Sequence, residues 1–118
     1  MIPEAGRVLV HQRRDRRLPI DPEKVFLLEA AGGETRIRTR KSSPVIDIRP
    51  LGDVAPLFEK YGFLRVHRSH VVNLRRIQEI RMRASGDGWE IVLRPPVKNL
   101  VPVSRSELHN LWKAFGEE

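Results

Sequence analysis

The chain has 118 residues, a net charge of +7 and no cysteine, and this length fits one domain with a single modest core. The absence of cysteine excludes disulfides, thiolate metal sites and a cysteine nucleophile, and it suits a reducing cytoplasm. No apolar stretch approaches the ~20 residues of a membrane helix, and residues 1–6 lack a secretory signal pattern, so we expect a cytoplasmic protein without membrane insertion.

Short strands dominate the first fifty residues. Alternating apolar residues predict strands at 8–11 and 18–20, on either side of a charged turn at 12–17. A continuous apolar run predicts a buried strand at 25–31. The next expected features are a turn at Gly32-Gly33, a returning strand at 35–40 and an edge strand with Pro44 at 42–49.

One amphipathic helix is expected in the middle of the chain. Apolar residues recur at helical spacing over 51–61, and Gly62 ends the pattern. Pro56 then has to lie in about the first turn, where a missing amide is tolerated.

The run 63–74 is the most informative part of the sequence. Leu64 and Val66 should face the core while Arg65 and His67 face outward. The polar tip 67–70 stands between buried anchors, which suits contact with a partner. The consecutive Val71 and Val72 break the alternation and predict a bend at the tip. Four arginines then follow with only Glu79 to oppose them, which favours a polyanionic partner: Arg75, Arg76, Arg81 and Arg83.

The last third predicts a hairpin, a strand and a helix. Alternation over 80–84 and 89–93 indicates a hairpin, and a short strand follows at 100–103. Ser104 and Glu107 fit a capping box, which places Arg105 at the first helical position. The expected apolar stripe is Leu108, Leu111, Trp112 and Phe115, with Gly116 as the stop. The fold class is therefore mainly β, with many short strands and two short helices.

Two motifs in this sequence resemble the LytTR family of bacterial DNA-binding domains. The family is marked by an HRS-x-(V/L)VN core and a downstream PVSR element, and both occur here, at 67–73 and 102–105. The segment 25–39 is also similar to the family's earlier strand-loop-strand, so the resemblance covers nearly the whole chain as one domain, 1–118. It implies small antiparallel sheets of about ten short strands, and double-stranded DNA read by loops.

The resemblance implies two base-reading arginines. Arg68 follows the first histidine of the core motif, where the family's residue reaches into the major groove, and an arginine there can bind guanine O6 and N7. Arg105 matches the arginine of the PVSR element, which reads a base in the family. The alternatives are a phosphate or solvent contact for Arg68 and an ordinary surface arginine beside a cap for Arg105.

A third contact is implied for the turn at 32–36. The family commonly has an aromatic residue where this chain has Glu34, so Glu34 either points away or accepts from a cytosine amino group. We therefore expect Thr35 or Arg36 to contact a base. The prolines in 94–99 are a second departure, because the family usually has a tight turn there. Residues expected to bind phosphate or to orient loops are His67, Ser69, Asn73, Ser104, Arg38, Arg40, Lys41 and Lys98.

Other functions fit these residues less well. His67 and His70 with Asp87 or Glu79 suggest a metal or acid-base site, but no third ligand stands at a telling distance, so we expect no enzyme, metal or cofactor. Net charge alone also fits solubility or an acidic protein partner. The alternative is therefore a basic protein- or RNA-interaction module. RNA readers usually expose stacking aromatics, whereas the ones here look like core: Phe58, Tyr61, Trp89, Trp112 and Phe115.

The sequence thus predicts a transcriptional regulator that reads the major groove of specific duplex sites through loops. The resemblance implies two copies on a direct-repeat site, with some bending of the DNA. Many relatives carry a phosphorylated receiver domain, and 118 residues are too few to include one. Regulation is therefore expected from a partner protein, from expression level or from a part outside this chain.

Overall fold

The computed structural model describes residues 6–117, so the expectation that residues 1–6 form no secretory signal lies outside it except at Gly6. Within this range no helix is long and apolar enough to span a bilayer. The strands are β1 (Val8–Arg13), β2 (Arg16–Ile20), β3 (Leu27–Ala31), β4 (Glu34–Arg38), β5 (Val45–Asp47), β6 (Phe63–His67), β7 (His70–Asn73), β8 (Ile77–Met82), β9 (Trp89–Leu93) and β10 (Leu100–Val103). The helices are α1 (Leu51–Glu59) and α2 (Leu108–Ala114), with 3-10 turns η1 (Pro22–Lys24), η2 (Leu74–Arg76) and η3 (Arg105–Glu107).

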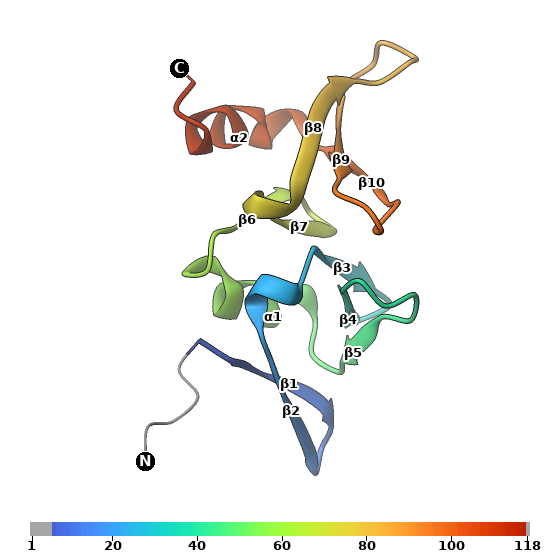
Figure 1. The fold of residues 1–118 in the computed structure, drawn as a ribbon, viewed down its shortest axis with the longest axis vertical. Helices are drawn as coiled ribbons and strands as arrows, with labels where there is room; N and C mark the ends of the chain where they lie inside the picture. The colour runs from blue at the N-terminus through green and yellow to red at the C-terminus, as the bar shows by residue number, and fades with distance from the viewer. Residues whose placement is uncertain (1–5, 118) are drawn as a thin grey trace.

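Three small antiparallel sheets follow one another along the long axis of the molecule (Figure 1). The β1–β2 hairpin lies at one end, a five-stranded sheet of order β5-β4-β3-β7-β6 lies in the middle, and the sheet β10-β9-β8 lies at the other end with α2. The principal extents are 48 × 31 × 26 Å. The predicted mainly β class, with small antiparallel sheets and two short helices, is confirmed.

Both faces of the central sheet are covered at its inner strands β3 and β7. One face packs against α1 and the β1–β2 hairpin, in a cluster that includes Leu28 and Phe58. The other face packs against the C-terminal sheet and α2, in a cluster that includes Phe26 and Leu111. Val71 belongs to the first cluster and Val72 to the second. The broken alternation therefore reflects a strand covered on both faces. The predicted bend at the tip is confirmed, because the chain reverses in a turn at 68–69 between β6 and β7, and β6 also has a bulge before His67.

Helix α1 differs from the expected one in the position of its proline. Pro56 lies in the second turn of Leu51–Glu59, so its placement in about the first turn is wrong. Proline removes a hydrogen bond within the helix, but its own ring is exposed and the apolar stripe around Val54 and Phe58 is fully buried. Packing therefore stabilises this short helix despite the missing bond. Gly62 ends the segment with a φ of 84°, as the pattern indicated.

The C-terminal helix begins later than predicted. Residues 105–107 form η3, and the Ser104 side chain makes no capping hydrogen bond, so the expected capping box is wrong. The Ser104 carbonyl instead accepts the Glu107 amide at 2.9 Å. Leu111 is buried, but Phe115 lies beyond the last helical residue and is 55% exposed, so its assignment to the core stripe is also wrong. Gly116 ends the helix with a φ of 80°.

Candidate nucleic-acid interface

Three segments singled out by the sequence meet at one end of the central sheet. The register of β3 with β4 and β7 makes the Gly32-Gly33 turn and the Arg68-Ser69 turn project from the same end. The Ala30 amide donates to the Ser69 carbonyl at 2.9 Å and ties the two turns together. The Ser104 amide donates to the Val66 carbonyl at 2.8 Å, which brings the start of η3 beside them. This region, defined by residues 32–33, 68–69 and 104–105, is termed the turn end.

Hydrogen bonds hold the β6–β7 turn in one conformation. His67 Nδ1 accepts the Ser69 amide at 3.0 Å. The Arg65 guanidinium donates to the Arg68 carbonyl through Nη2 and to the His67 carbonyl through Nε. These bonds use main-chain groups of the turn, so the Arg68 side chain stays exposed. Burial, followed by the nearby charges of His70 and Arg68, lowers the pKa of His67, which favours the neutral ring that can accept at Nδ1.

A groove separates the β6–β7 turn from η3. Its lining residues are Arg65, His67, Arg68, Ser104, Ser106 and Glu107. Arg105 stands between two of them, and its side chain is exposed like that of Arg68. Among the ion pairs of residues 6–117, none includes Arg68 or Arg105. The groove therefore has a basic rim, with Glu107 as its one acidic lining residue.

Thr35 does not fit the base contact expected of it. Its side chain is 0% exposed, and Oγ1 donates to the Arg49 carbonyl at 2.9 Å, because residue 35 lies on the same face of β4 as the buried Ile37. That expectation is therefore wrong. Arg36 lies on the other face of β4 and is exposed, so it remains the candidate from this turn. Glu34 is exposed beside it.

Two of the expected phosphate or orienting residues are occupied by internal contacts. Asn73 is 2% exposed; its Nδ2 donates to the Val25 carbonyl at 2.8 Å and its Oδ1 accepts the Arg75 amide at 3.1 Å. Asn73 is therefore an orienting residue, and the phosphate contact is wrong for it. Arg38 Nε donates to Glu29 Oε1 at 2.7 Å, so its charge is already paired.

Three further expected phosphate contacts lie at the far end of the central sheet. Arg40, Lys41 and Lys98 line a second groove, between the β4–β5 loop and the β9–β10 loop. Strand β4 starts at the turn end and runs toward this groove. The structure thus brings these three residues together, but not with Arg68 and Arg105. Their contact with phosphate stays a prediction.

The arginines that follow the polar tip are engaged within the protein. The Arg76 guanidinium donates to the Glu23 carbonyl and lies over the Phe26 ring, 4.9 Å from the ring centroid. The other contacts are Arg75 to Glu23 at 3.7 Å, Arg81 to Glu90 at 2.9 Å and Arg83 to Asp87 at 3.8 Å. Each of the four thus has a contact within the protein, and their binding to a polyanionic partner stays a prediction.

Glu29 is a partly buried carboxylate that links β3 to both neighbouring strands. It pairs with Arg38 on β4, and its Oε2 lies 3.7 Å from His70 Nε2 on β7. The interaction with His70 exceeds the opposing effect of burial, and with the Arg38 guanidinium it lowers the pKa of Glu29 to about 2. The carboxylate is therefore ionised at neutral pH, directly beneath the β6–β7 turn.

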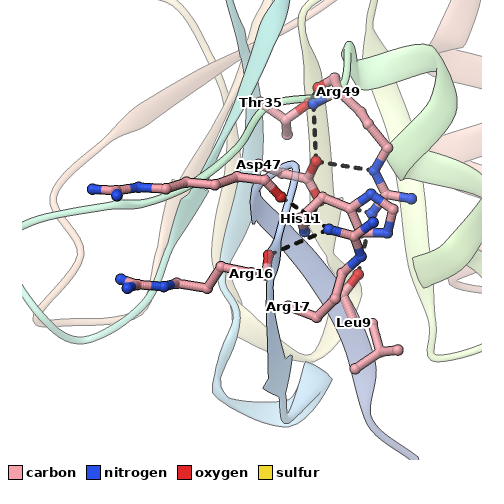
Figure 2. A network of polar contacts seen from close by, with 8 residues as sticks. Leu9, His11, Arg16, Arg17, Thr35, Asp47 and Arg49 are labelled. Carbon is pink, nitrogen blue, oxygen red and sulfur yellow. Dashed lines mark hydrogen bonds and ion pairs between the residues drawn. The ribbon is translucent and has the colours of Figure 1, made fainter.

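A second carboxylate network, which the sequence did not reveal, attaches β1 to the central sheet (Figure 2). Asp47 accepts the His11 amide at 3.1 Å, the Arg49 amide at 2.9 Å and the Arg49 guanidinium at 3.0 and 2.8 Å. Arg49 Nη2 also donates to the Leu9 carbonyl at 3.1 Å. Burial raises the pKa of Asp47, but the bonds from Arg49 and His11 outweigh it and hold the pKa below its usual value. The sequence feature that could have revealed this network is an aspartate between two isoleucines in a predicted strand.

The two histidines of the tip pack against each other. Their rings make an edge-to-face contact with centroids 5.2 Å apart. Across residues 6–117, no three histidine, aspartate, glutamate or cysteine side chains are grouped so as to hold a metal ion.

Comparisons with known proteins agree with the motifs. Residues 15–116 match the model of the LytTr DNA-binding domain. The CO-responsive transcriptional regulator RcoM of Rhodospirillum rubrum is 30% identical over 92 residues, which are 78% of this chain and 38% of RcoM. The transcriptional regulatory protein BtsR of Escherichia coli is 45% identical over 53 residues, 45% of this chain and 21% of BtsR. The chain thus spans well under half the length of these relatives.

A solved structure has the same fold. It is the LytTr DNA-binding domain of a protein described as a methyl-accepting/DNA response regulator from Bacillus cereus. The two superpose with a TM-score of 0.73 at 25% identity, over 94% of this chain and 97% of that one.

Proposed function

Because this chain belongs to the LytTR family of DNA-binding domains, we propose that its turn end reads specific duplex sequences and that it is the DNA-reading part of a transcriptional regulator. Such a regulator acts on cytoplasmic DNA. Relatives with this domain, RcoM and BtsR, are described as transcriptional regulators. The reading residues proposed here are Arg68, Arg105 and Arg36.

One observation carries the proposal: Arg68 lines the groove and Arg105 lies between two of its lining residues, both are exposed, and within residues 6–117 neither is ion-paired with a carboxylate. A guanidinium can donate two parallel hydrogen bonds to guanine O6 and N7 in the major groove, which is worth about 1–3 kcal/mol of discrimination. Arginines already paired inside the protein, such as Arg38, could do this only after breaking an existing contact.

The rigidity of the turn supports base reading over loose phosphate binding. Arg65 and His67 satisfy the main-chain groups of the turn, and β7 beneath it is fully buried at Val71 and Val72. A side chain that leaves a fixed main chain loses less conformational entropy when it binds. Ser69 and Ser104, at the same end, have hydroxyl groups suited to phosphate oxygens.

We further propose that two copies occupy a direct-repeat site and bend the DNA between them, and that a protein partner regulates binding. A head-to-tail arrangement on a direct repeat needs no two-fold interface between the copies. Each copy would then contact its half-site through the same turn end.

Titration of three nucleic acids tests the proposed function directly. The full chain is added to a duplex selected from genomic footprints, to each of its single strands and to the corresponding RNA, at two salt concentrations. We expect the duplex to bind most tightly, and its affinity to exceed that of a scrambled duplex. Equal binding of RNA and duplex, or of scrambled and selected duplex, would instead support a basic interaction module without sequence readout.

A further inference from the structure

The tip of the β1–β2 hairpin concentrates positive charge away from the turn end. Strands β1 and β2 extend further than the sequence predicted, to Arg13 and Arg16, so only Arg14 and Asp15 form the turn. Arg17 completes a run of four arginines with one aspartate. All five residues are exposed, and no ion pair within residues 6–117 involves them.

Arg17 closes the hairpin tip from one side. Its Nη1 donates to the Arg13 carbonyl at 2.9 Å and to the Arg14 carbonyl at 3.1 Å, across the turn. An isolated two-stranded hairpin is marginally stable in water, and these bonds restrain its end. The tip is therefore an ordered surface. Within residues 6–117, the side chains of Arg13, Arg14 and Arg16 take part in no hydrogen bond or ion pair.

Arg13 and Arg16 form an unfavourable pair in the free protein. They are cross-strand neighbours in the hairpin register, and like charges directly opposite each other destabilise an antiparallel pair. Figure 2 shows the Arg16 side chain extending away from the Asp47 network. An anion placed between the two guanidinium groups would remove the repulsion, which makes the pair a suitable phosphate site.

The hairpin is held in a defined position relative to the central sheet. Asp47, 1% exposed, and Arg49 bind the β1 main chain at His11 and Leu9, and the Ile48 amide donates to the His11 carbonyl at 2.8 Å. The hairpin occupies one extremity of a molecule 48 Å long (Figure 1). The turn end belongs to the central sheet, so any DNA contact made by the hairpin tip lies away from the bases read there.

We propose that the hairpin tip is a second DNA contact, in which Arg13 and Arg16 bind backbone phosphates that flank the sequence read by Arg68 and Arg105. This inference rests on the proposed function and adds a contact outside the turn end; the match to the family model begins at residue 15, so Arg13 precedes it and Arg16 lies within it. A phosphate contact adds affinity on every sequence and selects none.

The test compares salt dependence on long and short duplexes. The full chain with Arg13→Gln and Arg16→Gln is titrated on the selected site within a long duplex and on one trimmed to the bases read. Loss of two phosphate contacts should reduce the slope of log affinity against log salt by about 1.8 on the long duplex. On the trimmed duplex, variant and wild type should bind alike. A matched variant, Lys24→Ala with Lys113→Ala, removes the same charge from two other exposed sites and should leave the slope unchanged.

The outcomes separate the two proposals. If the wild type binds the selected duplex and the hairpin variant has the wild-type slope, or the same slope as the matched variant, the hairpin contact is overturned while the reading function stands. If the wild type shows no preference for the selected duplex, the proposed function itself fails. A second variant, Arg13→Lys with Arg16→Lys, keeps the charge and should retain the wild-type slope, which excludes a folding defect as the cause.

Discussion

The Arg68 side chain leaves a turn whose main-chain groups are already hydrogen-bonded, so its removal should change the contact with DNA and leave the fold intact. We expect Arg68→Ala to weaken binding to the selected duplex by about 1–3 kcal/mol and to flatten base preference at one position of the site. Affinities for a set of single-base variants of the site measure both effects. Uniform weakening on all sequences would show that Arg68 binds phosphate.

The ion pairs of Glu29 predict how the stability of the folded protein depends on pH, in the absence of DNA. Its pKa in the folded protein is about 2, below the ordinary 4.5, so its contribution to stability is fully present above pH 4.5 and is lost as the pH falls toward 2. Urea unfolding of wild type and Glu29→Gln should therefore show a difference at pH 6 that shrinks at pH 3. Glu79→Gln, at an exposed site, is the control. A difference that does not change with pH would contradict the ion pairs assigned to Glu29.

Asn73 joins β7 to the segment before β3, and both of its polar atoms are used inside the protein. Asn73→Ala leaves the buried Val25 carbonyl without its partner, so we expect a loss of about 2–3 kcal/mol in the free energy of unfolding. Urea denaturation measures it. Asn110→Ala, on the exposed side of α2, should change stability by less than about 0.5 kcal/mol. Equal effects of the two substitutions would mean that the Asn73 bonds contribute little.

The strands and turns could be predicted from the sequence where a single hydrophobic periodicity determines the local structure. Strands with one buried face, such as β4, and turns that need a positive φ, such as Gly32-Gly33, follow from local sequence. The burial of both Val71 and Val72 does not follow from local sequence. Each belongs to a different hydrophobic cluster, and the cluster of Val72 includes residues far along the chain, such as Leu111. The capping box failed for a related reason: the Ser104 amide is bound by β6, and the chain enters α2 through a 3-10 turn.

The sequence predicted which residues belong to the candidate site, but only part of how they are arranged in space. The motifs named Arg68 and Arg105, and strand pairing then placed their segments at one end of the sheet. The alternation along β4 could have excluded a base contact by Thr35, because Thr35 shares a face of β4 with the buried Ile37. No local pattern distinguishes Arg68, which is free, from Arg65, which binds the turn. That distinction depends on the hydrogen-bond geometry of the folded hairpin.

Across the whole molecule, several arginines are paired with carboxylates, so the count of 22 lysines and arginines overstates how many are available to a duplex. Arg38, Arg49, Arg75 and Arg81 already lie within ion-pair distance of carboxylates. If about five phosphates are contacted, the slope of log affinity against log salt should be near −4.5. Equilibrium titrations between low and physiological salt give this slope. Binding that does not respond to salt would favour an uncharged partner surface over DNA.

Cleavage of DNA from defined positions on the protein tests most directly whether the turn end reads one duplex. The chain has no cysteine, so Ser69→Cys and Ser106→Cys each provide a single attachment point for an iron–EDTA group beside Arg68 and Arg105, and Ser42→Cys provides one at the far end of the sheet. We expect the first two conjugates to cut the bound site at positions within about one helical turn of each other, and the third to cut weakly. Cutting by Ser42→Cys that equals or exceeds cutting from the turn end would contradict the account.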